Sequence, residues 1–296
     1  MPKQTKLHVE KNSPNVVTIR FDNVRQGWEK WFLLSSDRHH DSISCNRELE
    51  LEHLEQVRER DAHVLDFGDI FDAMQGKYDP RRSYAEMRKE YLEEMQKDKT
   101  GYLDVIVKDA VKFYKRHADR FALITQGNHE TAIHSHNDKD LIGSLIYDLN
   151  TSAKTQIVKG AYGGWVRFMF HLQGTQRESM RLKYFHGSGG GGPVTKGVIG
   201  SNRQAVFLPD ANIVVNGHIH ESWILALKRE RISDAAVVYQ DLQYHIRTGT
   251  YKDDYGDGSG GWHVERGAPP KPMGGVWMRF FYDRKHIRVA FTQDLR

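Results

Sequence analysis

The feature that most constrains the fold is a pattern that the chain repeats: a short run rich in β-branched and aromatic residues that ends abruptly in acids, amides or imidazoles. Such runs are typical of buried strands, and the polar residues directly after them mark where each strand ends. Four runs follow the pattern, at residues 31–36, 62–67, 121–125 and 212–215. We therefore predict four strands that each carry a polar cluster at the carboxyl end.

Helical patterns separate the early strands. Apolar side chains recur at three- and four-residue spacing, which predicts a helical pair within residues 81–119, and residues 50–57 and 138–149 indicate further helices. Residues 16–21, near the start of the chain, also have the character of a strand. After the helical patterns the chain is mainly strand-like, at residues 165–172, 180–185, 223–228, 236–239 and a hairpin of 276–281 with 286–291. This order favours an α/β sandwich, with two sheets packed together and helices outside.

The chain shows no internal repeat and no linker that divides it, so we expect one domain over residues 1–296. The helical segment at about residues 79–119 is then an insertion, which either caps the crevice at the strand ends or covers a sheet. Residues 251–273 form a long irregular stretch, and loops of that length are usually functional or disordered.

Composition excludes several classes of protein. The longest apolar stretches, such as residues 105–107, fall far short of the roughly 18 residues that cross a bilayer, and the polar N-terminus carries no secretory signal. We therefore expect a cytoplasmic protein with no membrane partner. A single cysteine, Cys45, rules out an intrachain disulfide and a zinc site built on several thiolates. The net charge of +4 tolerates a polyanionic partner without requiring one.

The polar clusters at the strand ends form an ordered set of metal-ligating residue types. Because strand carboxyl ends meet at one crevice of an α/β sheet, we expect the clusters to converge. Carboxylates, imidazoles and one amide suit Mn²⁺, Fe or Zn²⁺, whereas Ca²⁺ prefers oxygen ligands throughout. In chain order the clusters are Asp37-Arg38-His39, Gly68-Asp69, Gly127-Asn128-His129-Glu130, His186 and Gly217-His218-Ile219-His220.

This set, D-x-H, G-D, G-N-H-[DE], H and G-H-x-H, resembles the pattern of the calcineurin-like metallophosphoesterase superfamily and covers residues 37–220. The resemblance implies a four-layer α/β/β/α sandwich of two mixed β-sheets flanked by helices. It also implies two divalent metal ions, Mn²⁺ or alternatively Fe, Zn²⁺ or Ni²⁺. By the same resemblance the first ion is held by Asp37, His39 and His220, the second by Asn128, His186 and His218, and both by a bridging Asp69.

The resemblance further implies hydrolysis of a phosphate ester by a hydroxide that bridges the two ions. In that scheme His129 does not bind metal but protonates the leaving oxygen, and Asp72 orients the His129 imidazole. His186 competes with His171 for the ligand role, because both end apolar strands, but only His186 is followed by a glycine-rich run. Three more histidines in polar loops are expected to be solvated rather than ligating: His40, His134 and His136.

Substrate contacts are less constrained by the sequence. Gly189 lies in the glycine run after His186, where exposed backbone N–H groups suit an anion. Trp262 lies in the long irregular stretch, where it either stacks on a base or anchors the loop. Arg38, inside the first motif, is the third candidate for contact with the substrate.

The motifs also bear on which ester is cleaved. Serine/threonine phosphoprotein phosphatases resemble G-D-x-V-D-R-G and R-G-N-H-E at these positions, and their arginines grip a dianionic phosphate. This chain has Ala73 and Gln126 in place of those arginines, and its G-D-x-F at residues 68–71 is similar to the phosphodiesterase and nuclease branches. A site without bidentate arginine favours diesters, so a nucleotide or nucleic acid is a possible partner.

Two alternatives stay open. A phosphomonoesterase, including a phosphoprotein phosphatase, becomes the better interpretation if another arginine replaces the missing pair, and the candidates are Arg38, Arg81, Arg82 and Arg203. A non-catalytic scaffold, like the retromer subunit of this fold, is the remote alternative, since such proteins usually lose ligands and this chain keeps the full set.

Overall fold

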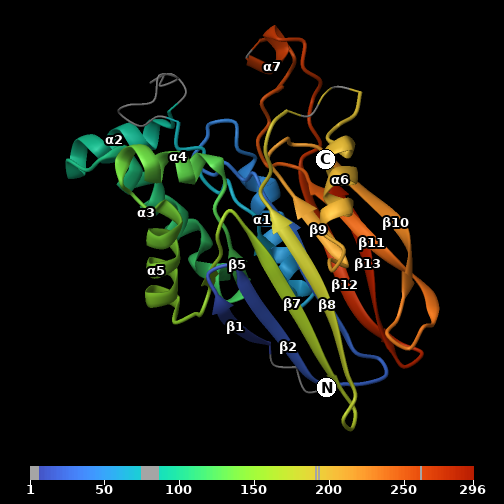
Figure 1. Ribbon diagram of the computed structural model, residues 1–296. Helices are drawn as coiled ribbons and strands as arrows, with labels where there is room; N and C mark the ends of the chain where they lie inside the picture. The colour runs from blue at the N-terminus through green and yellow to red at the C-terminus, as the bar shows by residue number, and fades with distance from the viewer. Residues whose placement is uncertain (1–6, 75–86, 191, 193, 261) are drawn as a thin grey trace.

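The computed structural model describes residues 7–74, 87–190, 192, 194–260 and 262–296 (Figure 1). Its strands form two sheets, one of seven strands and one of six. The seven-stranded sheet runs in the order β1 (His8–Ser13), β2 (Val16–Val24), β7 (Gly163–Leu172), β8 (Arg177–Phe185), β9 (Ile213–Asn216), β11 (Val238–Thr248), β10 (Ser222–Ile232). The six-stranded sheet runs in the order β13 (His286–Leu295), β12 (Gly274–Asp283), β3 (Glu29–Ser35), β4 (His63–Asp66), β5 (Phe121–Ile124), β6 (Val158–Lys159).

Both sheets are mixed. In the six-stranded sheet β3, β4, β5 and β6 are parallel, whereas β12 pairs antiparallel with both β3 and β13. In the seven-stranded sheet β8, β9 and β11 are parallel neighbours, and β10 closes the edge as an antiparallel hairpin with β11. The parallel strands β4, β5 and β9 are buried along almost their whole length, which explains why the sequence shows them as continuous apolar runs.

The two sheets pack face to face. Their shared core takes side chains such as Phe32 and Leu65 from the six-stranded sheet and Ile19 and Phe168 from the seven-stranded sheet, all with no exposed surface. Aromatic contacts cross the interface, for example between Phe32 and Phe168, whose ring centroids are 5.4 Å apart. Burial of this apolar surface is the main force that holds the sheets together.

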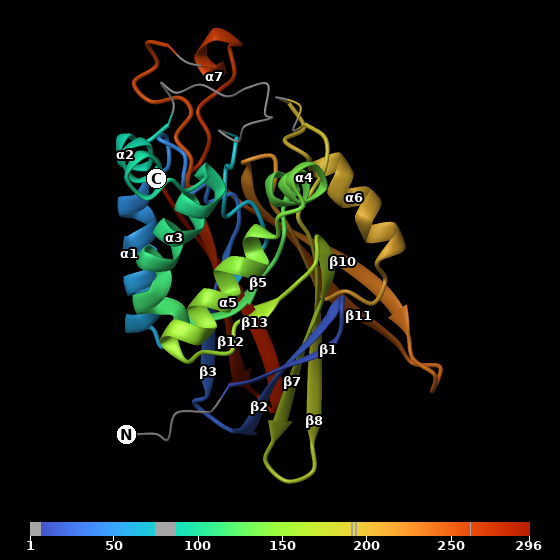
Figure 2. The same cartoon turned by 90° about the vertical axis from the view of Figure 1, so that its left-hand side faces the viewer.

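Helices cover the outer faces (Figure 2). A second apolar cluster joins the six-stranded sheet to five helices and a 3-10 turn. These are α1 (Arg47–Glu59), α2 (Lys89–Asp98), α3 (Tyr102–Tyr114), η2 (Lys115–Arg120), α4 (Asn128–Asn137) and α5 (Leu141–Ala153). On the opposite side α6 (Val198–Phe207) leads into a small cluster of Leu208, Ala211 and Val214 against the seven-stranded sheet. The predicted arrangement of two mixed sheets flanked by helices is therefore confirmed, with a fourth layer that is thin.

Several predicted elements differ in extent. The helix predicted from residue 138 begins at Leu141, because the Asp140 side chain accepts a hydrogen bond from the Gly143 N–H and caps it. A separate helix, α4, begins at Asn128, inside a motif that we expected to be a loop. The helical insertion starts, where it is described, with α2 at Lys89; residues 79–86 of the prediction lie outside the described residues.

In the segment expected to be irregular, residues 251–273, the described residues include a short helix, α7 (Trp262–Glu265). Strand β11 extends far beyond the predicted residues 236–239, because its polar side chains hide the strand pattern in the sequence. Within the described part of the chain, no helix combines the length and apolar character needed to span a bilayer.

Candidate metal centre

The predicted ligands follow neighbouring parallel strands at one end of the molecule. Asp37 follows β3, Asp69 follows β4 and Asn128 follows β5, and these three strands are adjacent in the six-stranded sheet. His186 follows β8 and His218 follows β9, which are adjacent in the seven-stranded sheet. The two sheets thus present their ligand loops to each other, and α4 and α6 lie near the same end (Figures 1 and 2).

One group of ligands is formed by Asp37, His39 and His220, whose ligand atoms lie within 4.8 Å of one another. The Nε2 atoms of His39 and His220 are 3.2 Å apart. Asp37 Oδ1 lies 3.4 Å from His220 Nε2 and 4.0 Å from His39 Nε2. The structure therefore brings together the three residues predicted to hold the first ion.

The second group is formed by Asp69, Asn128, His186 and His218. His186 Nε2 lies 3.0 Å from Asp69 Oδ2 and 3.1 Å from Asn128 Oδ1, and His218 Nδ1 lies 2.7 Å from the same amide oxygen. Asp69 also clusters with His39, so its carboxylate faces both groups, as the predicted bridging role requires. All seven predicted ligands meet at one place.

The ligand atoms of the two groups fit divalent cations, as the surroundings of His186 illustrate. Its Nδ1 donates to the Phe67 backbone carbonyl at 2.8 Å, so the lone pair of Nε2 points at the Asp69 carboxylate and the Asn128 amide oxygen. Three acceptors that converge at about 3 Å repel one another unless a positive charge lies among them. Without a cation that charge is a proton: burial opposes it, but Asp69 and Asp37 raise the pKa of His186 to about 10.

The two carboxylates are ionised and ready to bind metal at neutral pH. Burial favours the protonated form of Asp37, but the hydrogen bond from His220 and the charges of His186 and His220 lower its pKa to about 2. Burial acts in the same direction on Asp69, and the charges of His186 and His129 outweigh it to lower the pKa of that carboxyl well below its usual range.

Backbone contacts lock the ligand loops against each other. The Asp37 carboxylate accepts the backbone N–H of His218 at 2.9 Å, and Asp69 Oδ1 accepts the backbone N–H of His129 at 3.0 Å. Glu130, which is 1% exposed, accepts three further backbone N–H groups, from Gly127 at 2.7 Å, Phe71 at 3.0 Å and Asp69 at 3.1 Å. The last residue of the G-N-H-E motif therefore ties the second motif to the third.

Five of the seven predicted ligands also share an unusual backbone conformation. Asp37, His39, Asp69, His218 and His220 all have φ between 46° and 75°. This left-handed region is sparsely populated by residues other than glycine, and each such residue costs of order 1 kcal/mol that the surrounding structure must supply. Clusters of such residues are typical of functional sites, where the backbone turns to aim side chains at a common point.

The residues predicted to act on the leaving group lie beside the ligands. His129 Nε2 is 3.8 Å from Asp69 Oδ2, and its Nδ1 donates to the Asp72 backbone carbonyl at 2.5 Å. We expected the Asp72 carboxylate to orient His129, but the contact comes from the carbonyl. The Asp72 carboxylate turns instead to His39, with Oδ1 3.0 Å from His39 Nδ1. Burial disfavours charge on His129, yet Asp69 and Asp72 raise its pKa.

The prediction that Arg38 contacts substrate is wrong. Its side chain has no exposed surface, and it pairs with Asp66 at 2.7 Å and with Glu50 at 3.0 Å. Its guanidinium also lies over the Tyr251 ring, 4.8 Å from the centroid. An arginine in a motif can point away from the site, because the φ reversals at Asp37 and His39 send neighbouring side chains in opposite directions.

The other candidates differ in position. Gly189 is exposed in the loop after His186, and nothing lies within 4 Å of where a Cβ would be. Trp262 begins α7, and its side chain lies outside the described residues. Of the histidines expected to be solvated, His134 and His136 are exposed on α4, but His40 is wholly buried, with Nδ1 2.8 Å from Glu50. His171 pairs with Asp22 at 2.8 Å and belongs to neither ligand group.

Sequence reasoning missed Lys252. Its ammonium lies 3.1 Å from Asp72 Oδ1, beside the first ligand group. No spacing rule links it to the motifs, because it comes 32 residues after His220 in the chain. A lone lysine at the start of a long irregular stretch carries no signal of this role.

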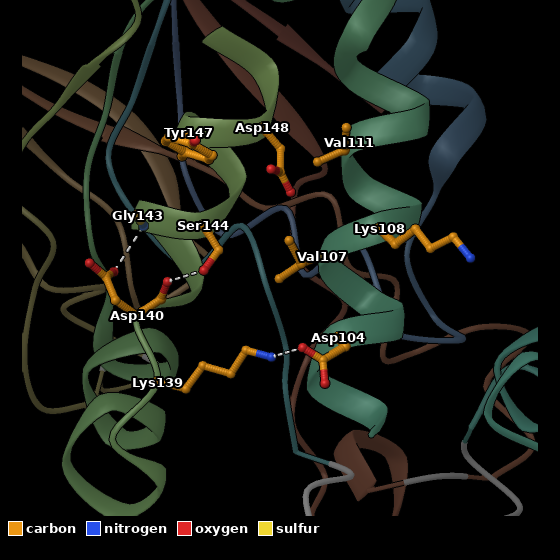
Figure 3. A pocket seen from close by; sticks show the side chains of 10 residues that line it. All are labelled: Asp104, Val107, Lys108, Val111, Lys139, Asp140, Gly143, Ser144, Tyr147 and Asp148. Atoms are coloured by element: carbon orange, nitrogen blue, oxygen red, sulfur yellow. Dashed lines mark hydrogen bonds and ion pairs between the residues drawn. The ribbon is translucent and has the colours of Figure 1, made fainter. Parts of the chain in front are cut away.

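A pocket of about 580 Å³ lies elsewhere, between α3 and α5 (Figure 3). Two contacts lie within its walls: Lys139 pairs with Asp104, and Asp140 accepts the Gly143 backbone N–H. None of the predicted ligands lines it. The pocket is therefore separate from the ligand groups.

The solved structures that are similar to this chain cover most of its length, but their sequence identities and TM-scores are low. No family model and no curated protein sequence matches the chain. Among solved structures, it is similar to vacuolar protein sorting 29 from Cryptosporidium parvum, with 14% identity, 91% of this chain and 100% of that chain covered, and a TM-score of 0.35. A conserved uncharacterized protein, a predicted phosphoesterase, from Streptococcus pneumoniae follows with 11% identity, 90% of each chain covered and a TM-score of 0.31.

A third similar structure is GAP50, the anchor in the inner membrane complex of Plasmodium, with 9% identity, 90% of this chain and 84% of that chain covered, and a TM-score of 0.41. The class of protein is therefore defined by the chain's own structure: two mixed sheets flanked by helices, with histidine and aspartate clusters able to bind metal ions at the strand ends.

Proposed function

We propose that this protein is a hydrolase that cleaves phosphate esters, phosphodiesters in preference to monoesters, with two divalent cations. The observation that carries the proposal is the convergence of His186 Nε2, the Asp69 carboxylate and the Asn128 amide oxygen, an arrangement of ligand atoms that suits a cation. The supporting observation is that ligands from both sheets meet within metal-binding distance of one another.

The proposal assigns the metal-binding residues to two cation sites. Asp37, His39 and His220 would hold one cation, Asn128, His186 and His218 the other, and Asp69 would face both. When bound, such a pair of cations lowers the pKa of water and neutralises charge on phosphoryl oxygens.

His129 supplies the proton for the leaving oxygen in this proposal. The Asp72 carbonyl accepts the Nδ1–H, and this contact fixes the ring so that Nε2 faces the ligand cluster. Burial disfavours the charged ring, but the neighbouring carboxylates raise the pKa of His129, and this direction favours the protonated imidazole that a general acid needs. The flanking carboxylates of Asp69 and Asp72 both favour that state.

The preference for diesters rests on the arginines. Arg38 is committed to buried carboxylates, and Arg203 is exposed on α6. Arg81 and Arg82 lie outside the described residues. Recognition of a monoester dianion usually relies on bidentate arginine, so a centre to which the motif positions, Ala73 and Gln126, contribute none favours the singly charged diester. A nucleotide or nucleic-acid diester fits the net charge of +4, and Mn²⁺ is the metal we propose.

The test compares hydrolysis of bis(p-nitrophenyl) phosphate with that of p-nitrophenyl phosphate by protein reconstituted with Mn²⁺. We expect a higher kcat/KM for the diester, and loss of both activities in Asp69→Asn, which removes the shared carboxylate. A clear preference for the monoester would favour the phosphomonoesterase. Absence of hydrolysis of either ester by metal-loaded protein would overturn the proposed reaction.

A further inference from the structure

Lys252 lies at the start of the long segment that follows β11, and the structure holds its backbone firmly. The Tyr251 N–H donates to the Asp37 backbone carbonyl at 2.9 Å, and the Asp253 N–H donates to the Ser44 carbonyl at 2.9 Å. Lys252 itself pairs with Cys45 in an isolated β-bridge. The backbone on both sides of Lys252 is therefore tied to the loop that carries the first metal-ligand motif.

The Lys252 side chain reaches inward from this anchored backbone. It is 11% exposed, and its ammonium lies 3.1 Å from Asp72 Oδ1 and 3.4 Å from Asp254 Oδ1. The same Asp72 oxygen lies 3.0 Å from His39 Nδ1. Asp72 Oδ1 thus sits between the ammonium and the imidazole of a predicted ligand, while the Asp72 carbonyl accepts from His129.

We infer that Lys252 is a positioning residue for the metal centre: by holding the Asp72 carboxylate it sets the orientation of the His39 imidazole. The inference rests on the proposed function, because it assigns His39 as a ligand. It goes beyond that function by placing a residue of the C-terminal segment in control of one metal site.

The physical case rests on burial and on shared contacts. Asp72 is 5% exposed, and a buried carboxylate needs a compensating cation and hydrogen-bond donors to stay in one orientation. An ammonium has three donors, so Lys252 can hold Asp72 Oδ1 and Asp254 together. Groups that orient a ligating imidazole typically affect metal affinity by 10- to 100-fold when removed.

The experiment titrates Mn²⁺ into metal-free protein and measures the affinity of each site directly. Lys252→Met removes the ammonium at nearly constant volume, and Lys252→Arg restores a cation that can reach Asp72. The matched control is Lys30→Met: Lys30 is also a buried, paired lysine, 3.2 Å from Asp61, but it lies at the end of β3 away from Asp37. Urea unfolding of each variant separates lost stability from lost affinity.

We expect Lys252→Met to weaken one of the two sites by about 10- to 100-fold, Lys252→Arg to recover most of that loss, and Lys30→Met to bind like the parent. The nitrogen chemical shifts of His39 in metal-free protein give a second readout: one fixed tautomer in the parent, and a mixture in Lys252→Met. Should Lys252→Met fail to fold, Lys252→Gln, which keeps a donor without the charge, is judged by the same two measurements.

Parent-like affinity at both sites in the Lys252 variants, with an unchanged His39 tautomer, would overturn this inference and leave the proposed function intact. Failure of the parent protein itself to bind Mn²⁺ would overturn the proposed function and the inference together. If Lys30→Met weakened Mn²⁺ binding as much as the Lys252 variants do, the loss would reflect lower stability of the fold in general. That result would also overturn the positioning role of Lys252.

Discussion

Replacing Gly127 by alanine adds one methyl group where two ligand loops cross. A Cβ at this position would lie 2.0 Å from Asp69 Oδ1 and 2.5 Å from the Asp69 backbone nitrogen. Non-bonded heavy atoms prefer separations of about 3.5 Å or more. One of the loops must therefore move by roughly 1.5 Å, and the nearest group that can move is the carboxylate that faces both ligand groups.

Such a displacement is large on the scale of metal coordination, where ligand distances hold to within about 0.2 Å. We expect Gly127→Ala to lose at least about 100-fold in Mn²⁺ affinity, which corresponds to about 2.7 kcal/mol of binding free energy. Overpacking also strains the fold, so the free energy of unfolding should fall by about 1–3 kcal/mol.

The assay is direct titration of Mn²⁺ into metal-free protein, together with urea unfolding of each protein. The matched control is Gly200→Ala on α6, where nothing lies within 4 Å of the added Cβ. This control should bind Mn²⁺ like the parent, and its free energy of unfolding should rise by about 0.5–1 kcal/mol because alanine favours a helix. Two equivalents of Mn²⁺ bound by Gly127→Ala with parent affinity would refute the claim that Asp69 is a ligand held in this crossing.

Three further predictions test the site and the fold. His129→Ala should keep both Mn²⁺ equivalents and lose about 10²- to 10⁴-fold in kcat, and loss of bound metal would contradict its proton-donor role. Arg38→Met removes the cation that pairs with two buried carboxylates and should cost about 3–5 kcal/mol in urea unfolding; a cost under about 1 kcal/mol would contradict this. Burial lowers the pKa values of His53 and His245 to about 4, so the stability that these neutral side chains contribute above about pH 6.5 should fall as the pH drops from 6.5 to 4. His53→Gln should reduce that pH dependence, and urea midpoints that shift equally in the parent and in His53→Gln between pH 7 and pH 5 would refute the argument.

The strand ends were the most predictable part of the molecule. Buried parallel strands such as β4 and β9 leave a local signature, because nearly every side chain faces apolar surroundings and the polar residues begin where the strand stops. Strand β11 was predicted only in part, since its first residues are exposed and polar side chains interrupt the pattern along its length. Helix α4 was not predicted, because it begins within the motif at Asn128 and its apolar stripe is weak.

Contacts between the motifs could not be predicted from the sequence in the same way. Arg38 stands between two predicted ligands in sequence, yet its side chain is buried against Asp66 and Glu50. The Asp72 carboxylate contacts His39, although its sequence position suggested His129. These outcomes depend on backbone φ values and on which loops lie opposite each other, and residue identity alone sets neither.

The sequence by itself determined which chemical groups stand at the ends of the strands, since residue type and strand periodicity are local properties of the chain. Only the tertiary structure decided which of those groups face a cation and which face one another. The packing of two sheets brings together predicted ligands that lie up to 183 residues apart in the chain, such as Asp37 and His220. The same packing brings Lys252 to Asp72, because long-range side-chain contacts are fixed by the folded core, and no local pattern encodes them.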